Sequence, residues 1–240
     1  MDANVKEQID DLLAHYSGLR AVALPEGSFR LGGIVRLDAE NDGRDYLVRD
    51  FPVRVEIDAD YPISTPKVWV EDESLLTGYE HVFADGSLCL GVFGELALLR
   101  QSDSSLTRFM DDIVIGNLYA VEYHRIFGEM PSGERRHGSD GIIEAYQELF
   151  GVDDPCAAMR LLAVACGIED YRGHANCPCG SGVRTRDCHG DILMKFIKGF
   201  SRVVAKGDFY SIVKERLIIQ KQKEDQEQRL SILRERMGLK

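Results

Sequence analysis

The sequence predicts an α+β fold in which helices and strands are segregated along the chain. Residues 4–17 place apolar side chains at helical spacing, residues 19–71 change to short β-branched or alternating runs, and helical periodicity returns after Cys89. This order indicates an antiparallel sheet with helices before and after it, rather than alternating βαβ units. With 240 residues, 44% of them hydrophobic, the chain is long enough for one or two domains.

The predicted strands form an antiparallel meander. Turn-forming residues separate them at Pro25–Gly27, at 41–43 and at Tyr61–Pro66. The two prolines of the last cluster predict an extended crossing segment before the final strand. We expect the four strands within residues 19–24, 28–37, 46–58 and 67–72.

Helices are predicted through the rest of the chain. Ser105 is the expected N-cap of a helix over 106–127, and a second helix is expected to open at Asp153–Pro155. The charged helix from about 208 to 237 has a polar gap that breaks any heptad, so it predicts an exposed extension, with a partner-binding helix as the alternative. We place the domain boundary at 150, which gives domains of residues 1–150 and 151–240.

Charge and composition exclude several classes of function. The net charge is −11, so the surface repels phosphate backbones, and we expect no nucleic acid among the partners. The N-terminus lacks the pattern of a secretory signal, and the longest apolar runs are far below membrane-spanning length. No GxxxxGK or GxGxxG pattern indicates a phosphate-binding loop. We expect a soluble, cytoplasmic protein without a membrane partner, in which six cysteines favour metal or thiol chemistry over disulfides.

Residues 176–190, NCPCGSGVRTRDCHG, contain a cluster of candidate metal ligands. The cluster consists of Cys177, Cys179, Cys188 and His189. Three thiolates and one imidazole are typical of a closed tetrahedral site, and a full ligand shell leaves no position for a reactive water. We therefore expect a structural Zn²⁺, with a chance cysteine-rich loop as the alternative.

The run CPCGSG, followed by a basic stretch and Cys-His, resembles the SEC-C zinc motif. That motif ends the bacterial preprotein translocase ATPase and is appended to many bacterial proteins. The resemblance implies a structural knuckle or a docking site rather than a catalytic centre. Cys156 and Cys166 lie on a predicted helix, and we expect them in its core rather than on the metal.

The remaining cysteine, Cys89, lies in the segment HVFADGSLCLG at 81–91. Its apolar neighbours and the lack of a flanking Lys or Arg favour a buried strand residue. The Asp-Gly-Ser turn immediately before it favours a displayed thiol. The residues by themselves leave both interpretations open.

The order of parts in residues 1–150 resembles the ubiquitin-conjugating enzyme fold. Tyr61–Pro66 matches the family's Tyr-Pro-x-x-x-Pro crossing, and residues 86–90 match the segment that runs from a glycine to the active-site cysteine and leucine. The resemblance implies that Cys89 carries an acyl group as a thioester and transfers it to a lysine.

His81 is where this sequence departs from that family. Tyr79-Glu80-His81 stands in place of the family's His-Pro-Asn, so His81 occupies the position of the asparagine credited with supporting the loop and the oxyanion. A histidine ring can donate one hydrogen bond to an oxyanion, and with an ordinary pKa of about 6.5 it can accept the proton of an amine. A loop-bracing hydrogen bond to the backbone is the alternative role.

The segment around Cys89 is acidic, because Glu80, Asp85 and Glu95 are not balanced by any Lys or Arg between 68 and 99. Nearby carboxylates disfavour a thiolate, so we expect Cys89 to be a weak nucleophile at rest. Such a thiol suits an acyl carrier that accepts an already activated thioester. Asp85 could orient an attacking lysine, although Asp-Gly is also an ordinary turn pair.

Residues 132–151 and the zinc motif are not features of eukaryotic conjugating enzymes. The whole chain resembles the bacterial conjugating-enzyme-like proteins of CBASS antiphage operons, which lie beside a cGAS-like nucleotidyltransferase. This resemblance implies that the acyl donor is that nucleotidyltransferase or a ubiquitin-like modifier and that the acceptor is a lysine-bearing protein. Because the sequence has no phosphate-binding loop pattern, we expect the donor to be activated by a separate ATP-using enzyme or to arrive already primed. The basic segment 134–137 could contact the donor's tail, with a solvated loop as the alternative.

Two other functions stay open on the sequence. A non-catalytic binding module on the same fold would use the long C-terminal helix and the zinc knuckle to recruit partners. A cysteine hydrolase would need an activated thiol paired with His81, or with His124 or His137 brought close by the fold.

Overall fold

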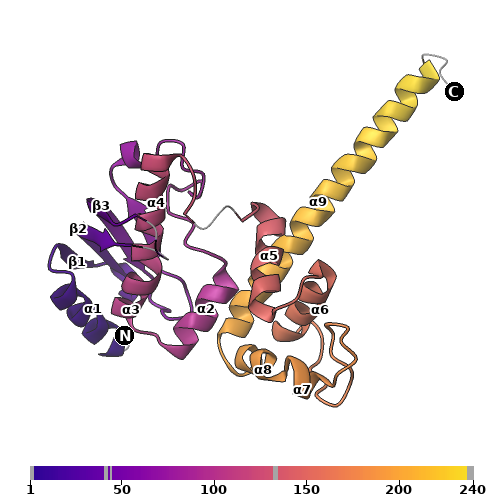
Figure 1. The fold of residues 1–240 in the computed structure, drawn as a ribbon, viewed down its shortest axis with the longest axis horizontal. Helices are drawn as coiled ribbons and strands as arrows, with labels where there is room; N and C mark the ends of the chain where they lie inside the picture. Colours follow the sequence, from indigo (N-terminus) through magenta and orange to yellow (C-terminus); the bar gives the residue numbers. More distant parts are fainter. Residues whose placement is uncertain (1–2, 41–42, 44, 132–134, 237–240) are drawn as a thin grey trace. The chain divides into compact units, whose positions relative to one another are not determined.

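The structure, a computed structural model, describes residues 3–40, 43, 45–131 and 135–236, with side chains from residue 5 to residue 228 within these ranges. The protein divides into two compact units, Met1–Glu134 and Arg135–Lys240 (Figure 1). This division differs from the predicted boundary at 150, because helix α5 (Gly138–Phe150) packs on helices α6 (Pro155–Ala165) and α9 (Ser201–Arg236). None of the helices in the described part of the protein is long and apolar enough to cross a membrane.

The first unit is built on a four-stranded antiparallel sheet, as the sequence predicts. Its strands follow sequence order and are β1 (Leu19–Ala23), β2 (Phe29–Ala39), β3 (Leu47–Ile57) and β4 (Lys67–Val70). β2 and β3 pair along their whole length, beginning with Phe29 opposite Ile57. Alternate side chains of the two strands are buried, including Leu31, Val35 and Phe51, so one face of the sheet carries the core.

Helices α1 and α4 pack on this sheet. The helical elements of the unit are η1 (Pro25–Gly27), η2 (Glu73–Leu76), α1 (Ala3–His15), α2 (Phe93–Ser102), α3 (Leu106–Phe109) and α4 (Ile115–Phe127). Ser105 caps α3 as predicted, because its hydroxyl accepts a hydrogen bond from the Arg108 backbone N–H at 3.3 Å. A π-helical turn, η3 (Met110–Val114), interrupts the predicted continuous helix between α3 and α4.

The segment between β3 and β4 is a compact turn rather than the extended crossing that its prolines predict. The Tyr61–Pro62 peptide bond is cis. The Tyr61 hydroxyl donates to the Ser104 carbonyl at 2.7 Å, and the Arg100 guanidinium donates to the carbonyls of Pro62 and Ile63 at 3.0 and 3.2 Å. These bonds to α2 and the residues after it come from tertiary structure, so local proline chemistry could not predict the turn.

The second unit is helical. Besides α5, α6 and α9 it contains α7 (Thr185–Cys188) and α8 (Gly190–Lys198). The rings of Tyr146 and Phe150 on α5 pack on Phe196 of α8, and the Tyr146 hydroxyl donates to the buried Asp208 carboxylate at 2.9 Å. Helix α9 begins earlier than predicted, and its side chains are exposed throughout 217–228, as expected for an extension into solvent.

Candidate functional site

Cys89 follows a short hairpin that is docked on β4. Val82 and Leu88 form a β-bridge, and the Phe83 N–H donates to the Ser87 carbonyl at 2.8 Å. The Leu88 N–H donates to the Val68 carbonyl of β4 at 2.7 Å, and the Leu88 side chain is 2% exposed. The hairpin is therefore fixed to the sheet directly before Cys89.

The turn of this hairpin is closed by Asp85, Gly86 and Trp69. Gly86 has a φ of 81°, a conformation that favours glycine. The Trp69 ring lies on the side of Gly86 where the side chain of another residue would project. The Trp69 ring N–H donates to the Asp85 carbonyl at 3.0 Å. The Asp85 carboxylate accepts hydrogen bonds from the backbone and hydroxyl of Ser87 at 3.1 and 2.6 Å and pairs with Lys67 at 2.9 Å. These groups, the Ser87 hydroxyl first, hold the pKa of Asp85 well below its usual range.

The Cys89 thiol is half-buried at the end of the hairpin, so it is neither a fully buried core residue nor a fully displayed one. Its backbone N–H donates to the His81 carbonyl at 2.9 Å. Burial raises the pKa of Cys89, and a hydrogen bond from the Gly91 backbone opposes the shift. The raised pKa of Cys89 agrees with the prediction that its thiolate is disfavoured, but the predicted cause is wrong. Burial, rather than nearby carboxylates, raises the pKa of the thiol, and one of the predicted carboxylates, Asp85, is paired with Lys67.

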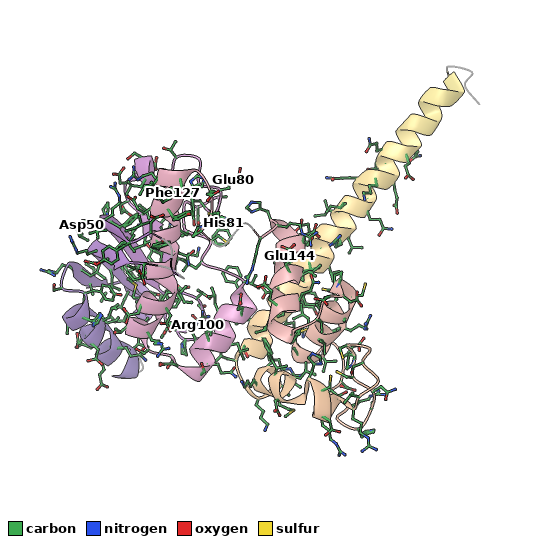
Figure 2. The ribbon with its side chains drawn as sticks, in the orientation of Figure 1. Asp50, Glu80, His81, Arg100, Phe127 and Glu144 are labelled. Carbon is green, nitrogen blue, oxygen red and sulfur yellow. The ribbon has the colours of Figure 1, made fainter. Side chains whose placement is uncertain are left out.

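The aromatic ring of Tyr79 is a neighbour of this thiol. The ring of Tyr79 lies 5.8 Å from the His81 ring and 5.6 Å from the His124 ring, between centroids. Burial raises the pKa of Tyr79 first, and the charge of a Cys89 thiolate raises it further, so the phenol and the thiol lie close enough to interact. Figure 2 labels His81 and Glu80 in the loop near the Phe127 end of α4. The fold thus brings Tyr79 close to Cys89 and the His124 ring against Tyr79, whereas His137 belongs to the second unit.

Asn117 on α4 is a polar neighbour of the cysteine loop that the sequence interpretation missed. Its side-chain amide N–H₂ lies 2.9 Å from the Ile113 carbonyl and 3.4 Å from the Leu90 carbonyl, one residue after Cys89. The π-helical turn η3 ends at Val114 and changes the helical register just before Asn117. Because Asn117 is far from Cys89 in the sequence, no local spacing could have revealed it.

The four predicted metal ligands converge in the second unit. Their ligand atoms all lie within 4.8 Å of one another. The Sγ atoms of Cys179 and Cys188 are 3.7 Å apart, and the His189 Nδ1 lies 3.1 Å from the Cys188 Sγ and 3.3 Å from the Cys177 Sγ. With Zn–S near 2.3 Å and Zn–N near 2.0 Å, a tetrahedral site would need separations of about 3.8 Å and about 3.6 Å. The cluster therefore has the donor set and nearly the dimensions of a four-ligand metal cage.

Backbone hydrogen bonds fold the metal-ligand loop. The Cys177 N–H donates to the Val183 carbonyl at 2.8 Å, and the Gly180 N–H donates to the Cys177 carbonyl at 3.0 Å. Gly180 and Gly182 have φ values of 90° and 76°, which let the backbone turn back as the sequence predicts. Although burial acts to raise it, the pKa of Cys179 is lowered to about 6 by hydrogen bonds from Ser181 and the neighbouring thiols.

The second ring nitrogen of His189 connects the cluster to the helical core. Its Nε2 lies 2.9 Å from the Phe150 carbonyl at the end of α5, so Nε2–H donates and Nδ1 is free to bind a metal. The Phe150 ring also packs edge-on against the His189 ring. A metal on Nδ1 would therefore stabilise the packing of α5 on the loop.

The other two cysteines lie outside the cluster, but only one is a core residue. Cys166 is 1% exposed, as predicted. The prediction was wrong for Cys156, which is exposed because it lies in the first turn of α6, directly after its N-cap region. Its backbone N–H donates to the carboxylate of Asp154 at 2.9 Å.

The described arginines of segment 134–137 are already paired. Arg135 pairs with Glu148, and Arg136 pairs with Glu144 and Asp140, all on α5. Residue 134 lies outside the described residues. These pairs favour the solvated loop over a contact with a donor's tail.

Comparisons with known proteins add a weak structural likeness. No family model matches the sequence, and no curated protein matches it. Among solved structures, the crystal structure of the yeast vps23 UEV domain in complex with a vps27 PSDP peptide matches with a TM-score of 0.28 and 16% identity, over 39% of this chain and 67% of that chain. A likeness at this level carries no argument about function.

Proposed function

We propose that this protein is a cysteine acyltransferase of the ubiquitin-conjugating type, with Cys89 as the acyl carrier. The Cys89 hairpin is the observation that carries the proposal. A turn closed by Asp85 and docked on β4 ends in a half-buried thiol, with His81 on the opposite arm and Tyr79 beside it. The order of motifs that resembles the conjugating-enzyme family supports the same assignment.

In the proposed reaction, the Cys89 sulfur attacks the carbonyl of a protein C-terminus that arrives as a thioester, and the donor's previous thiol leaves. A lysine amine then attacks the new thioester, so that a C–N bond forms and the C–S bond to Cys89 breaks. His81 either donates a hydrogen bond to the oxyanion or accepts the proton that the amine loses. The raised pKa of Cys89 limits its reaction with other electrophiles while it waits for an activated donor.

The proposed donor is a cGAS-like nucleotidyltransferase or a ubiquitin-like modifier in a bacterial antiphage system. Because the sequence has no phosphate-binding loop pattern, a separate enzyme would use ATP to activate the donor. The acceptor would be a protein lysine. Asp85, which already binds the Lys67 ammonium, could hold the substrate lysine instead.

We also propose that Cys177, Cys179, Cys188 and His189 bind Zn²⁺ in a structural role. The three thiolates and one imidazole fill all four positions, which suits stability rather than catalysis. Metal analysis of the purified protein should find one zinc per molecule, and substitution of Cys188 by serine should abolish it. A protein that folds equally well without any metal would contradict this role.

A non-catalytic binding module is the second candidate. The raised pKa of Cys89 favours it, because a thiol that stays neutral is a poor nucleophile. If this candidate holds, a Cys89→Ala variant will protect cells or bind partners as well as the wild type does.

The acyltransferase proposal is tested by incubating the protein with ATP and with the products of the adjacent genes, which include the proposed donor and activating enzyme. The mixture is then run on a non-reducing gel. We expect a slower-migrating adduct that reducing agent removes. Cys89→Ala should abolish the adduct, and Cys89→Ser should convert it to an ester that resists reducing agent. Cys156→Ala is the matched control, since it removes an exposed thiol outside the site. An adduct that survives in Cys89→Ala would overturn the proposal.

A further inference from the structure

Helix α9 carries an exposed apolar stripe on the face that points away from the other helices of the second unit. Val203, Tyr210 and Leu217 are 68%, 54% and 61% exposed. They follow one another at intervals of seven residues, which span about two helical turns, so their side chains lie on one face. The opposite face, with the buried Ala205 and Ile212, packs on α5, α6 and α8 (Figure 1). The described part of the protein therefore leaves this stripe uncovered.

Lysines border the apolar stripe. Lys206, Lys214 and Lys221 are three or four residues away from its members and lie on the same face of the helix. The Lys206 Nζ lies 5.9 Å from the centre of the Tyr210 ring. None of the three lysines forms an ion pair within the part of the chain that the structure describes. The outer face of α9 is therefore both apolar and positively charged.

The carboxylates of the same stretch are used on the other side of the helix. Between residues 203 and 221 the acidic residues are Asp208 and Glu215. Asp208 is 4% exposed and accepts the Tyr146 hydroxyl of α5, and Glu215 accepts the Ser139 backbone N–H at the start of α5 at 2.7 Å. Both carboxylates hold α9 on α5, so the lysines of the outer face keep their charge for a group outside this unit.

We propose that this face of α9 binds an acidic amphipathic helix of a partner protein. Apolar side chains at seven-residue spacing form the seam along which two helices pack, and opposite charges beside such a seam select the partner. Gly207 borders the stripe without a side chain, so a partner backbone can approach closely there. The partner helix would carry apolar residues at the same spacing, flanked by Asp or Glu that meet Lys206, Lys214 and Lys221. This inference does not depend on the role of Cys89.

Two other occupants fit this face less well. In a second copy of the chain, a parallel pair would place each lysine beside its own equivalent. The antiparallel pair that stacks Val203 on Leu217 would place Lys206 opposite Lys214. An anionic membrane would repel residues 1–134, which contain 25 Asp and Glu against 11 Lys and Arg.

Fluorescence anisotropy of a labelled peptide tests the proposal. The peptide has three heptads with leucine at positions a and d and glutamate at e and g, and its glutamates prevent it from pairing with itself. We expect saturable binding to the whole chain that weakens as salt rises. The double variant Lys214→Glu/Lys221→Glu should bind at least about tenfold more weakly and should instead bind the same peptide with lysine at e and g. Lys198→Glu/Lys223→Glu, which removes two exposed lysines outside the stripe, is the matched control and should bind as the wild type does.

The apolar contact is tested separately. Leu217→Ser should weaken binding of the acidic peptide at least about tenfold, whereas Ile219→Ser, on the far side of the helix, should leave it unchanged. Circular dichroism should show the wild-type helix content in both variants, because both side chains are exposed.

Four results would overturn the proposal. One is the absence of saturable peptide binding by the wild type, and another is equal binding by Leu217→Ser or by Lys214→Glu/Lys221→Glu. Sedimentation velocity that shows a dimer lost in Leu217→Ser would assign the stripe to a second copy of the chain. Binding to phosphatidylserine vesicles that Leu217→Ser abolishes would assign it to a membrane.

Discussion

At the residue scale, the proposed chemistry depends on the half-buried Cys89 thiol. Because burial raises its pKa, the thiolate fraction at neutral pH is lower than that of a free cysteine and grows as the pH rises. We predict that iodoacetamide alkylates Cys89 slowly at pH 7 and that the rate rises through a midpoint above that of N-acetylcysteine. Mass mapping of the alkylated peptide measures the rate. A midpoint at or below that of N-acetylcysteine would contradict the burial argument.

His81 provides the second prediction at this scale. If its ring serves the oxyanion or the amine proton, His81→Ala should slow transfer to lysine by about 10²- to 10³-fold, while the adduct on Cys89 still forms. His81→Asn, which restores an amide donor, should stay within about tenfold of the wild type. His15→Ala, an exposed histidine of the same unit, is the control. Equal losses in adduct formation and in transfer would instead assign His81 to bracing the loop.

Residue chemistry within a short segment could be predicted from the sequence, and chemistry that depends on tertiary burial could not. Cys177, Cys179, Cys188 and His189 converge because their spacing and the intervening glycines largely determine the loop. The pKa of Cys89 is raised by burial, and this burial depends on residues packed around the thiol that the sequence does not reveal. Asn117 reaches the cysteine loop only through the fold of α4.

At the element scale, hydrogen bonds of Asp85 and Trp69 hold the turn of the hairpin formed by residues 82–88. We predict that Asp85→Ala loosens it, since three hydrogen bonds are lost. Trp69 fluorescence should shift to the red, and Cys89 alkylation at pH 7 should accelerate several-fold. Asp50→Ala, an exposed carboxylate of β3, should leave both unchanged. A Trp69 spectrum identical to that of the wild type would show that Asp85 does not hold the turn.

The meander and the capped helix starts were predictable because alternation and capping are local signals. Four strands appear in sequence order, and Ser105 and Asp154 cap their helices. The turn before β4 depends instead on distant hydrogen bonds from Arg100. The π-helical turn η3 likewise leaves no local signal in the sequence.

At the scale of the whole molecule, the two units differ in charge and in what stabilises them. Residues 1–134 contain 25 Asp and Glu against 11 Lys and Arg, whereas residues 135–240 contain 15 against 18. The unit that carries Cys89 therefore accounts for the acidity of the protein. A partner that docks on this unit should carry a basic patch, and its affinity should fall as salt rises.

Metal removal tests how the second unit is stabilised. A chelator, or Cys188→Ser, should lower the unfolding temperature of the second unit by at least about 10 °C, because zinc contributes folding free energy and His189 links the cluster to Phe150. Trp69 fluorescence should report an unchanged transition in the first unit. Cys156→Ser is the control. If both transitions move together, or neither moves, the metal is not a structural element of one unit.

The most direct test of the central claim is single-turnover discharge to free lysine. The protein is loaded with a glycine-ending peptide thioester, excess donor is removed, lysine is added, and intact mass is followed with time. We predict an acyl adduct on Cys89 that decays with formation of the lysine amide, faster than any adduct on Cys156. Lysine-independent decay, or equal rates at Cys89 and Cys156, would contradict the assignment of Cys89 as an acyl-transfer cysteine.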